Sequence, residues 1–214
     1  MSSIISPSAE KYVSQHTTPE DLLTLKINEE TVKNHPHAHM LSGHVQGRLL
    51  SFLSKIIRPE YVLEIGTFTG YSALYLSEGI IEGGELHTIE IRQEDAETAL
   101  KNFKHSRNNN FITLHVGNAK EIIPALPFKW DLVFIDADKR SYIEYYELVI
   151  SRLSEKGVII ADNVLFHGQV LDEPILGKNA LAIDAFNKHI SNDPRVEQVM
   201  LTVRDGLLLI KKKE

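Results

Sequence analysis

The chain has 214 residues with 23 basic and 29 acidic side chains, which gives a formal net charge of -6 at pH 7. Hydrophobic residues make up 43% and charged residues 24%, so the composition is that of a folded globular protein and excludes a disordered one. The acidic balance argues against nucleic acid as the main partner, because phosphate binding needs a basic face. The absence of cysteine excludes disulfides, thiolate metal sites and a cysteine nucleophile.

The apolar segments of the chain are too short to cross a membrane. The first residues, Met-Ser-Ser-Ile-Ile-Ser-Pro, lack the charged start and the long apolar core of a secretion signal. We therefore expect a soluble, cytoplasmic protein with no membrane partner. The length fits one α/β unit, so we expect residues 1–214 to form one domain.

Helical signals dominate the first 60 residues. A short helix is expected around 8–15, and Thr18-Pro19-Glu20-Asp21 combines a capping hydroxyl, a proline and two acids, which is typical of a second helix start. From Gly43 to Ile57 the apolar residues recur at helical spacing, which indicates an amphipathic helix. Residues 1–60 are therefore predicted to be a helical extension of an α/β core at 61–214.

Three histidines interrupt this extension at His35, His37 and His39, and their spacing could suggest a metal site. No cysteine or carboxylate accompanies them, and Pro36 makes the segment irregular. We favour the interpretation that the segment is a solvated loop.

From Tyr61 onward, short apolar runs alternate with helical segments. The runs expected to be strands are Tyr61–Ile65, Glu85–Ile89, Phe111–Val116, Trp130–Ile135 and Gly157–Ala161. The expected helices cover 71–79, 93–105, a short stretch near 121, 141–153 and 179–191. This alternation predicts a doubly wound, parallel sheet that is covered by helices on both faces.

The end of the chain departs from the alternation. The runs Val196–Val203 and Leu207–Lys211 are joined by Arg204-Asp205-Gly206, and Asp-Gly is a strong hairpin signal. The sheet is therefore predicted to end in an antiparallel hairpin.

A glycine-containing turn follows the first predicted strand. Gly66 and Gly70 allow backbone conformations and close approaches that a Cβ would block, and a helix begins directly after them. Such a turn often holds a nucleotide-like ligand, although a tight connection without a ligand fits these residues equally well. The spacing Gly66-x-x-x-Gly70 is not G-x-G-x-x-G, which argues against a dinucleotide-dependent oxidoreductase.

Polar side chains stand at the ends of three later strands, where open α/β sheets bind ligands. Glu90 ends the second strand and could accept both hydroxyls of a ribose, although a surface glutamate is a competing reading. Asp136 follows the fourth strand, and Asp162-Asn163 follow the fifth. Their oxygens suit Mg²⁺ or Ca²⁺, whereas a helix cap and a turn are the alternatives.

Taken together, the segments Leu63–Ser72, Ile89–Glu90, Asp136–Lys139 and Ala161–Val164 resemble the cation-dependent O-methyltransferases. That family uses S-adenosylmethionine (SAM) and includes the caffeoyl-CoA and catechol O-methyltransferase-like enzymes. The resemblance runs from about Met40 to the C-terminus. It implies a seven-stranded, mostly parallel, Rossmann-like sheet with a terminal antiparallel hairpin, and a homodimer.

The resemblance also implies roles for individual residues. SAM would be bound by Ser42, Glu64, Gly66, Thr67, Ser72, Glu90, Ala119 and Asp136. Within this set, Glu90 would hold the ribose and Ala119 would line the adenine pocket. A divalent metal, Mg²⁺ in first place with Ca²⁺ or Mn²⁺ as alternatives, would be held by Asp136, Asp162 and Asn163. Lys139, together with Asp136, would be catalytic, and Lys139 would act as the base.

The implied reaction is methyl transfer from SAM to one hydroxyl of a vicinal dihydroxy phenol. Three alternatives remain open at this point: methylation of a non-catechol small molecule, a SAM-binding module without turnover, and the less favoured oxidoreductase. A CoA ester is not supported, because the basic N-terminal feature of the plant enzymes is not recognisable here. The acceptor would be chosen by the loop Phe166–Lys178 and the N-terminal segment, whose conformations do not follow from the sequence.

Overall fold

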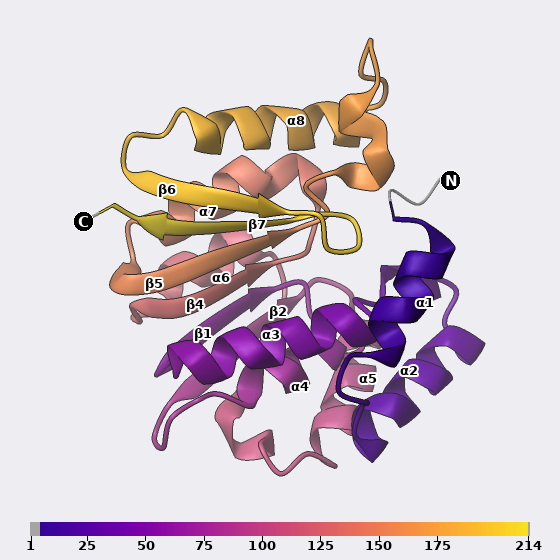
Figure 1. Ribbon diagram of the computed structural model, residues 1–214. Helices are drawn as coiled ribbons and strands as arrows, with labels where there is room; N and C mark the ends of the chain where they lie inside the picture. Colours follow the sequence, from indigo (N-terminus) through magenta and orange to yellow (C-terminus); the bar gives the residue numbers. More distant parts are fainter. Residues whose placement is uncertain (1–4, 214) are drawn as a thin grey trace.

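A seven-stranded sheet organises the chain, of which the computed structural model describes residues 5–213. Residues 1–4 and 214, which are the ends of the expected domain, lie outside this described part. The first four residues of the segment in which no secretion signal is expected therefore lie outside it too. The strands are β1 (Tyr61–Ile65), β2 (Glu85–Glu90), β3 (Ile112–Val116), β4 (Trp130–Ile135), β5 (Leu153–Asp162), β6 (Val196–Leu201) and β7 (Leu207–Lys212). Their order in the sheet is β3-β2-β1-β4-β5-β7-β6 (Figure 1).

The first five strands are parallel, and β7 runs antiparallel to both β5 and β6. The predicted doubly wound sheet and its terminal hairpin are therefore confirmed. The strand order reverses between β1 and β4, since β1 pairs with β2 on one side and with β4 on the other. In such sheets the crevice at the carboxyl ends of the strands beside this reversal is where ligands bind.

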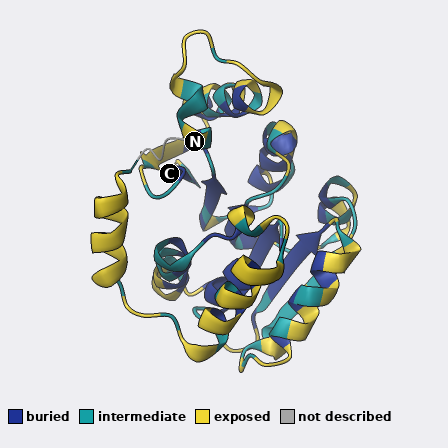
Figure 2. Ribbon diagram, turned by 90° about the vertical axis from the view of Figure 1, so that its right-hand side faces the viewer, coloured by how far each residue is buried: buried dark blue, intermediate teal, exposed yellow. Residues whose placement is uncertain are grey.

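Helices cover both faces of the sheet, as Figure 1 shows with α3 and α4 in front of the strands and α6 and α7 behind them. The α-helices are α1 (Pro7–Gln15), α2 (Leu22–Asn34), α3 (His44–Ile57), α4 (Tyr71–Ser77), α5 (Gln93–Phe103), α6 (Ala119–Ala125), α7 (Tyr142–Ile150) and α8 (Lys178–Ser191). Short 3-10 turns are η1 (Ala38–Met40), η2 (Asn109–Phe111), η3 (Lys139–Ser141) and η4 (Phe166–Leu171). Figure 2 shows the strands buried and the outer faces of the helices exposed.

Two apolar cores lie on the two faces. One core joins the sheet to α6, α7 and α8 and contains Trp130, Tyr146 and Phe186. The other joins the sheet to α2, α3, α4 and α5 and contains Leu50 and Tyr75. Because the central strands β1 and β4 are buried on both faces, their apolar runs in the sequence are nearly continuous rather than alternating. No helix within residues 5–213 is long and apolar enough to cross a membrane.

The two largest differences from the predicted boundaries are at the starts of β5 and α2. Strand β5 begins at Leu153 rather than Gly157, because Leu153 pairs with Trp130 across a register shift and extends the strand through polar residues. Helix α2 begins at Leu22, and its cap is Asp21 rather than Thr18. The Asp21 carboxylate accepts hydrogen bonds from the backbone N–H groups of Leu23 and Thr24, both at 2.9 Å.

The histidine segment is only partly the predicted solvated loop. His37 and His39 are exposed, as predicted. His35 is half-buried, its Nε2 lies 2.9 Å from the Asp95 carboxylate, and its ring packs edge-on against Phe68 with 4.6 Å between centroids. The solvated prediction is therefore wrong for His35, which fastens the N-terminal extension to α5 and to the turn after β1.

A buried histidine, His87 on β2, pairs with a half-buried one, His115 on β3. Nδ1 of His87 lies 2.9 Å from Nε2 of His115, and the His87 ring packs against Phe128 with 4.5 Å between centroids. Burial lowers the pKa of both imidazoles, and repulsion from His115 lowers the pKa of His87 further, although Glu85 partly opposes this. Because the folded pKa lies below the ordinary value, the neutral pair stabilises the fold above about pH 6.5 and this stability is lost as pH falls.

Replacing His115 by glutamine, which does not titrate, is expected to make the thermal midpoint less sensitive to pH. The midpoint of the wild type should fall more steeply than that of His115→Gln between about pH 7.5 and about pH 5.5. Differential scanning calorimetry measures both slopes. The control is His105→Gln, which changes an exposed histidine and should keep the wild-type slope. Equal slopes in the wild type and His115→Gln would contradict the prediction.

Candidate active site

A cavity of about 770 Å³ opens at the carboxyl edge of the sheet, beside the reversal in strand order. This volume is in the range of sites for small organic ligands. Nine residues predicted for the site line it: Ser42, Gly66, Thr67, Ser72, Glu90, Ala119, Asp136, Lys139 and Asn163. The other two, Glu64 and Asp162, are fully buried and precede Ile65 and Asn163, which line the cavity. The fold thus brings most of the predicted cofactor residues and two of the three predicted metal ligands to a single cavity.

The turn after β1 is packed directly against the segment after β4. Gly66 has φ +100°, and a Cβ there would lie 2.0 Å from the backbone oxygen of Asp136. Its N–H donates to the carbonyl of Ile89 at 3.0 Å, and the N–H of Asp136 donates to the carbonyl of Ile65 at 2.9 Å. Only glycine fits this approach, which holds the cofactor turn and Asp136 in one rigid arrangement.

Glu64 is a buried carboxyl group with an unmet acceptor. The hydroxyl of Thr88 donates to its Oε2 at 2.5 Å, whereas Oε1 has no hydrogen-bond partner within residues 5–213. Burial raises the pKa of Glu64 to about 8, although hydrogen bonds from Ser72 and Thr88 partly oppose the shift. A buried oxygen without a partner is costly, so this arrangement favours a ligand that donates an N–H there.

Glu90 is oriented by the backbone on both sides of it. Its Oε2 accepts from the N–H of Phe68 at 2.7 Å and its Oε1 accepts from the N–H of Arg92 at 2.9 Å. Each carboxylate oxygen keeps a further lone pair. The side chain lines the cavity at the end of β2 and can therefore accept from a pair of vicinal hydroxyls.

Two carboxylates and one amide form a group that we call the oxygen triad: Asp136, Asp162 and Asn163. Asp136 directly follows β4, Asp162 is the last residue of β5, and Asn163 follows it. Burial raises the pKa of Asp162 to about 7, and repulsion from the Asp136 carboxylate adds to the shift. The amide Nδ2 of Asn163 donates to Asp205 at 3.1 Å, which leaves Asn163 Oδ1 as the acceptor. Two mutually repelling carboxylates with an amide oxygen are a donor set that fits a hard divalent cation.

Gln46 is a site residue that the sequence analysis missed. It lies on α3 with a side chain only 1% exposed, and its Nε2 donates to Oδ2 of Asp162 at 2.6 Å. The backbone N–H of Asn163 donates to the other carboxylate oxygen at 2.6 Å. Gln46 therefore orients Asp162. The only local signal was an uncharged polar residue on the buried face of an amphipathic helix.

Lys139 is bound to Asp136. Its Nζ donates to Oδ1 of Asp136 at 2.8 Å and to the hydroxyl of Tyr142 at 2.7 Å. The Tyr142 hydroxyl in turn donates to the backbone carbonyl of Asp162 at 3.0 Å. Burial lowers the pKa of Lys139, but attraction to Asp136, Tyr142 and Asp162 together outweighs it, so the pKa lies above its ordinary value. In this arrangement the lysine is a cation that compensates Asp136.

Left-handed backbone is concentrated around the cavity. Within residues 5–213, six residues other than glycine have positive φ, and five of them line the cavity. These five are Phe68, Asn163, Phe166, His167 and Arg204. Such conformations cost free energy in ordinary residues and cluster at functional sites, where the surrounding structure holds them.

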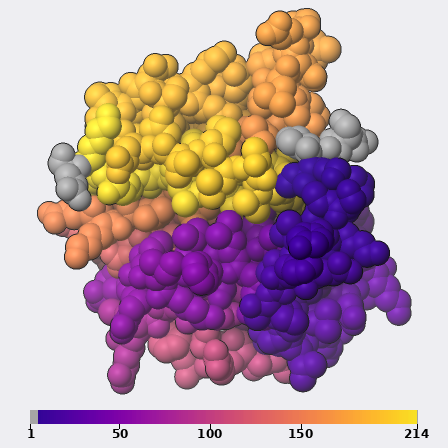
Figure 3. Space-filling view, in the orientation of Figure 1, coloured from indigo at the N-terminus to yellow at the C-terminus, as the bar shows by residue number. Residues whose placement is uncertain are grey.

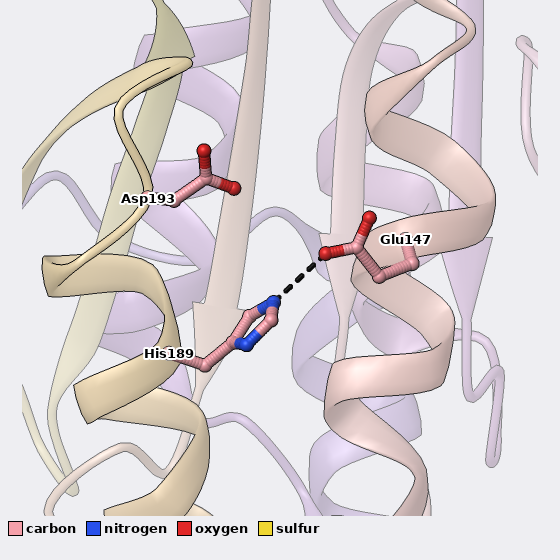
Figure 4. Close-up of side chains that lie close together, drawn as sticks. All are labelled: Glu147, His189 and Asp193. Carbon is pink, nitrogen blue, oxygen red and sulfur yellow. Dashed lines mark hydrogen bonds and ion pairs between the residues drawn. The ribbon is translucent and has the colours of Figure 1, made fainter.

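A second group of potential metal ligands lies away from this cavity. Figure 4 shows the α7–α8 cluster, which consists of Glu147 on α7, His189 on α8 and Asp193 after α8. Arg195 already joins its two acids, since Nη2 lies 2.8 Å from Glu147 and 2.6 Å from Asp193. This contact and the hydrogen bond from Tyr146 lower the pKa of Asp193. We interpret the cluster as an ion-pair network that fastens α7 to α8 and β6.

Solved structures with the same architecture define the class as Rossmann-like methyltransferases. A Podospora anserina methyltransferase bound to S-adenosylhomocysteine (SAH) aligns with a TM-score of 0.90 and 26% identity, covering 100% of each chain. The O-methyltransferase TomG from Streptomyces achromogenes, involved in tomaymycin synthesis and solved in complex with SAM, aligns with a TM-score of 0.87 and 26% identity, covering 97% of this chain and 96% of TomG.

The sequence itself matches the O-methyltransferase family over residues 14–213, and the protein belongs to that family. A catechol O-methyltransferase from Niastella koreensis is 31% identical over 94% of this chain and 92% of its own length. A caffeoyl-CoA O-methyltransferase from Medicago sativa is also 31% identical, over 91% of this chain and 83% of its own length. The family predicted from the sequence motifs is confirmed, and the oxidoreductase alternative is not supported.

Proposed function

We propose that the protein transfers a methyl group from SAM to one hydroxyl of a catechol-type phenol, with a divalent cation held by the oxygen triad. The observation that carries this proposal is the single cavity shared by the turn at Gly66, the acid Glu90 and two members of the oxygen triad. Membership of the O-methyltransferase family and the similarity to a catechol O-methyltransferase support it. The SAH and SAM named for the structural neighbours support the cofactor.

The residues fit SAM at both of its polar ends. The unpartnered Oε1 of Glu64 would accept from the ammonium of the methionine part, and the neighbouring turn at Gly66, which lines the cavity, would lie beside it. Glu90 would accept from the ribose hydroxyls, and Ala119, at the start of α6, would line the adenine pocket.

The triad would hold the metal, with Gln46 keeping Asp162 in position. When bound, a divalent cation supplies Lewis-acid polarisation of the acceptor hydroxyls and positive charge beside the two carboxylates. Lys139 would take the proton of the reacting hydroxyl at Nζ. This role requires its raised pKa to fall, which follows when the charge of Asp136 is engaged by a cation rather than by the lysine.

Methyl transfer to catechol from methyl-labelled SAM tests the proposed function. Labelled O-methyl product is expected with Mg²⁺ present, should disappear with excess EDTA and should return when Mg²⁺ is added back. A non-catechol phenol assayed beside it separates the catechol assignment from O-methylation of other acceptors. Product formation that is unchanged by EDTA would contradict the metal assignment, and no product from any acceptor would favour a SAM-binding module.

Glu64 makes a separate prediction about cofactor binding. Its pKa of about 8 means that the carboxyl is mainly protonated at pH 7 in the free protein, whereas a ligand ammonium favours the carboxylate. SAH binding is therefore expected to release a proton near pH 7 and to tighten as pH rises toward 8. Calorimetry in buffers of different ionisation enthalpy measures this release.

Glu64→Gln should abolish the proton release and weaken SAH binding by roughly tenfold or more, because a hydrogen bond to a charged group is lost. The control is Glu60→Gln, which changes an exposed acid just before β1 and should bind SAH like the wild type. Unchanged proton release in Glu64→Gln would overturn the assignment of Glu64 to the ammonium.

A further inference from the structure

Three permanently charged cations line the cavity, namely Arg92, Lys139 and Arg204. Two of them form an ion pair with a carboxylate and one does not. Arg92 is paired, since its Nη2 lies 2.5 Å from the Asp95 carboxylate. Lys139 is paired with Asp136. Arg204 makes no ion pair within 4.0 Å among the described residues of the chain, and its longer-range attraction is to the Asp162 carboxylate.

Arg204 forms a hydrogen bond to a neutral group. Its Nη2 donates to the backbone carbonyl of His39 at 3.0 Å. A guanidinium carries five N–H donors, so most of its donors remain for a ligand or for water. A half-buried cation that lines a ligand cavity and lacks a carboxylate partner favours an anion there.

The backbone around Arg204 fixes where this charge lies. Arg204 has φ +50° in the turn between β6 and β7, and its neighbour Asp205 accepts from Asn163 Nδ2 at 3.1 Å and from the N–H of His167 at 2.5 Å. The turn is therefore tied to one member of the oxygen triad and to the loop after β5. Figure 3 shows the N-terminal part of the chain bordering the yellow C-terminal part. The hydrogen bond from Arg204 to His39 is one link between these two parts.

We propose that Arg204 is a specificity-determining residue that binds an anionic group, in first place a carboxylate, on the catechol acceptor. The inference rests on the proposed function, because it assigns the acceptor class of the same cavity. The planar fork of arginine matches a carboxylate with two parallel hydrogen bonds. The phosphates of a CoA ester carry the same charge, so the test includes both sources.

The test compares four acceptors in steady-state kinetics: neutral catechol, 3,4-dihydroxybenzoate, the cationic dopamine and caffeoyl-CoA. Arg204→Gln is expected to raise KM for 3,4-dihydroxybenzoate by roughly tenfold to a hundredfold, because a charged hydrogen bond is lost. The same variant should leave KM for catechol within about twofold, and Arg204→Glu should improve dopamine relative to 3,4-dihydroxybenzoate. Arg107→Gln removes an exposed arginine outside the cavity and should match the wild type for all four acceptors.

Calorimetric binding of 3,4-dihydroxybenzoate to the SAH complex gives a readout without turnover, and the thermal midpoint verifies that each variant is folded. A rise in KM that Arg204→Gln shows only with caffeoyl-CoA would support the anion site and would assign phosphate as the bound group. Equal losses for catechol and 3,4-dihydroxybenzoate would overturn the proposal and leave Arg204 as a structural tie to His39. If the wild type methylates none of the acceptors, the proposed function fails, and the binding comparison still decides the role of Arg204.

Discussion

Asp136→Asn is expected to lower kcat for catechol methylation by at least about a hundredfold, with a much smaller loss of SAH affinity. Metal polarisation of a reacting oxygen contributes several kcal/mol to lowering a barrier, and each ~1.4 kcal/mol is a factor of ten in rate. Asp136 is the carboxylate of the triad that lines the cavity, and it repels Asp162 and binds Lys139. Replacing Asp136 should therefore weaken the cation site and also break the ion pair with Lys139.

Asparagine keeps the shape of the side chain, so the backbone contact between Asp136 and Ile65 should survive. The measurements are kcat as a function of Mg²⁺ concentration and SAH affinity by calorimetry. The matched control is Asp131→Asn at the opposite end of β4, where the carboxylate accepts from Tyr61 N–H and Ser154 hydroxyl. That control should lose stability but keep its response to Mg²⁺. An unchanged kcat and Mg²⁺ response in Asp136→Asn would contradict the assigned role.

Gly66→Ala is expected to damage both the fold and the cofactor site. Its φ of +100° is unfavourable for alanine, at a cost of roughly 1–2 kcal/mol, and the new Cβ would overlap the backbone of Asp136, which adds roughly 1–3 kcal/mol. The carbonyl of Asp136 must move to accommodate it. SAH affinity should therefore fall by at least about tenfold, in addition to the loss of unfolding free energy.

The control for this substitution separates backbone strain from overlap. Gly83 has φ +83°, but a Cβ there meets nothing within 4 Å. Gly83→Ala should therefore cost only the strain, roughly 1–2 kcal/mol, and should bind SAH like the wild type. Urea unfolding and calorimetry compare the two variants. Equal losses of stability in both, with normal SAH binding by Gly66→Ala, would show that the close approach to Asp136 has no functional consequence.

The sheet could be predicted because its information is local. Each parallel strand is a short apolar run bounded by turn residues, and the Asp205-Gly206 pair marks the hairpin between β6 and β7. The start of β5 could not be predicted, because Ser154 to Lys156 are polar and become strand through pairing that begins at Leu153 with Trp130. The apolar part of a strand can be predicted from the sequence, but a polar extension such as this one depends on pairing with the neighbouring strand.

The sequence predicts residues for the candidate site but not the contacts that support them. Carboxylates directly after buried strands are visible in the sequence, so Asp136 and Asp162 were found. Gln46 lies 116 residues from Asp162, and Arg204 lies 165 residues from His39. Contacts of this range follow from how α3 and the hairpin pack on the sheet, and no local pattern encodes them.

An anomalous diffraction map from crystals grown with SAH and Mn²⁺ tests the proposed metal site most directly. We expect a manganese peak bounded by Asp136, Asp162 and Asn163, next to density for SAH in the cavity. A peak at the α7–α8 cluster, with none at the oxygen triad in the presence of SAH, would contradict this expectation.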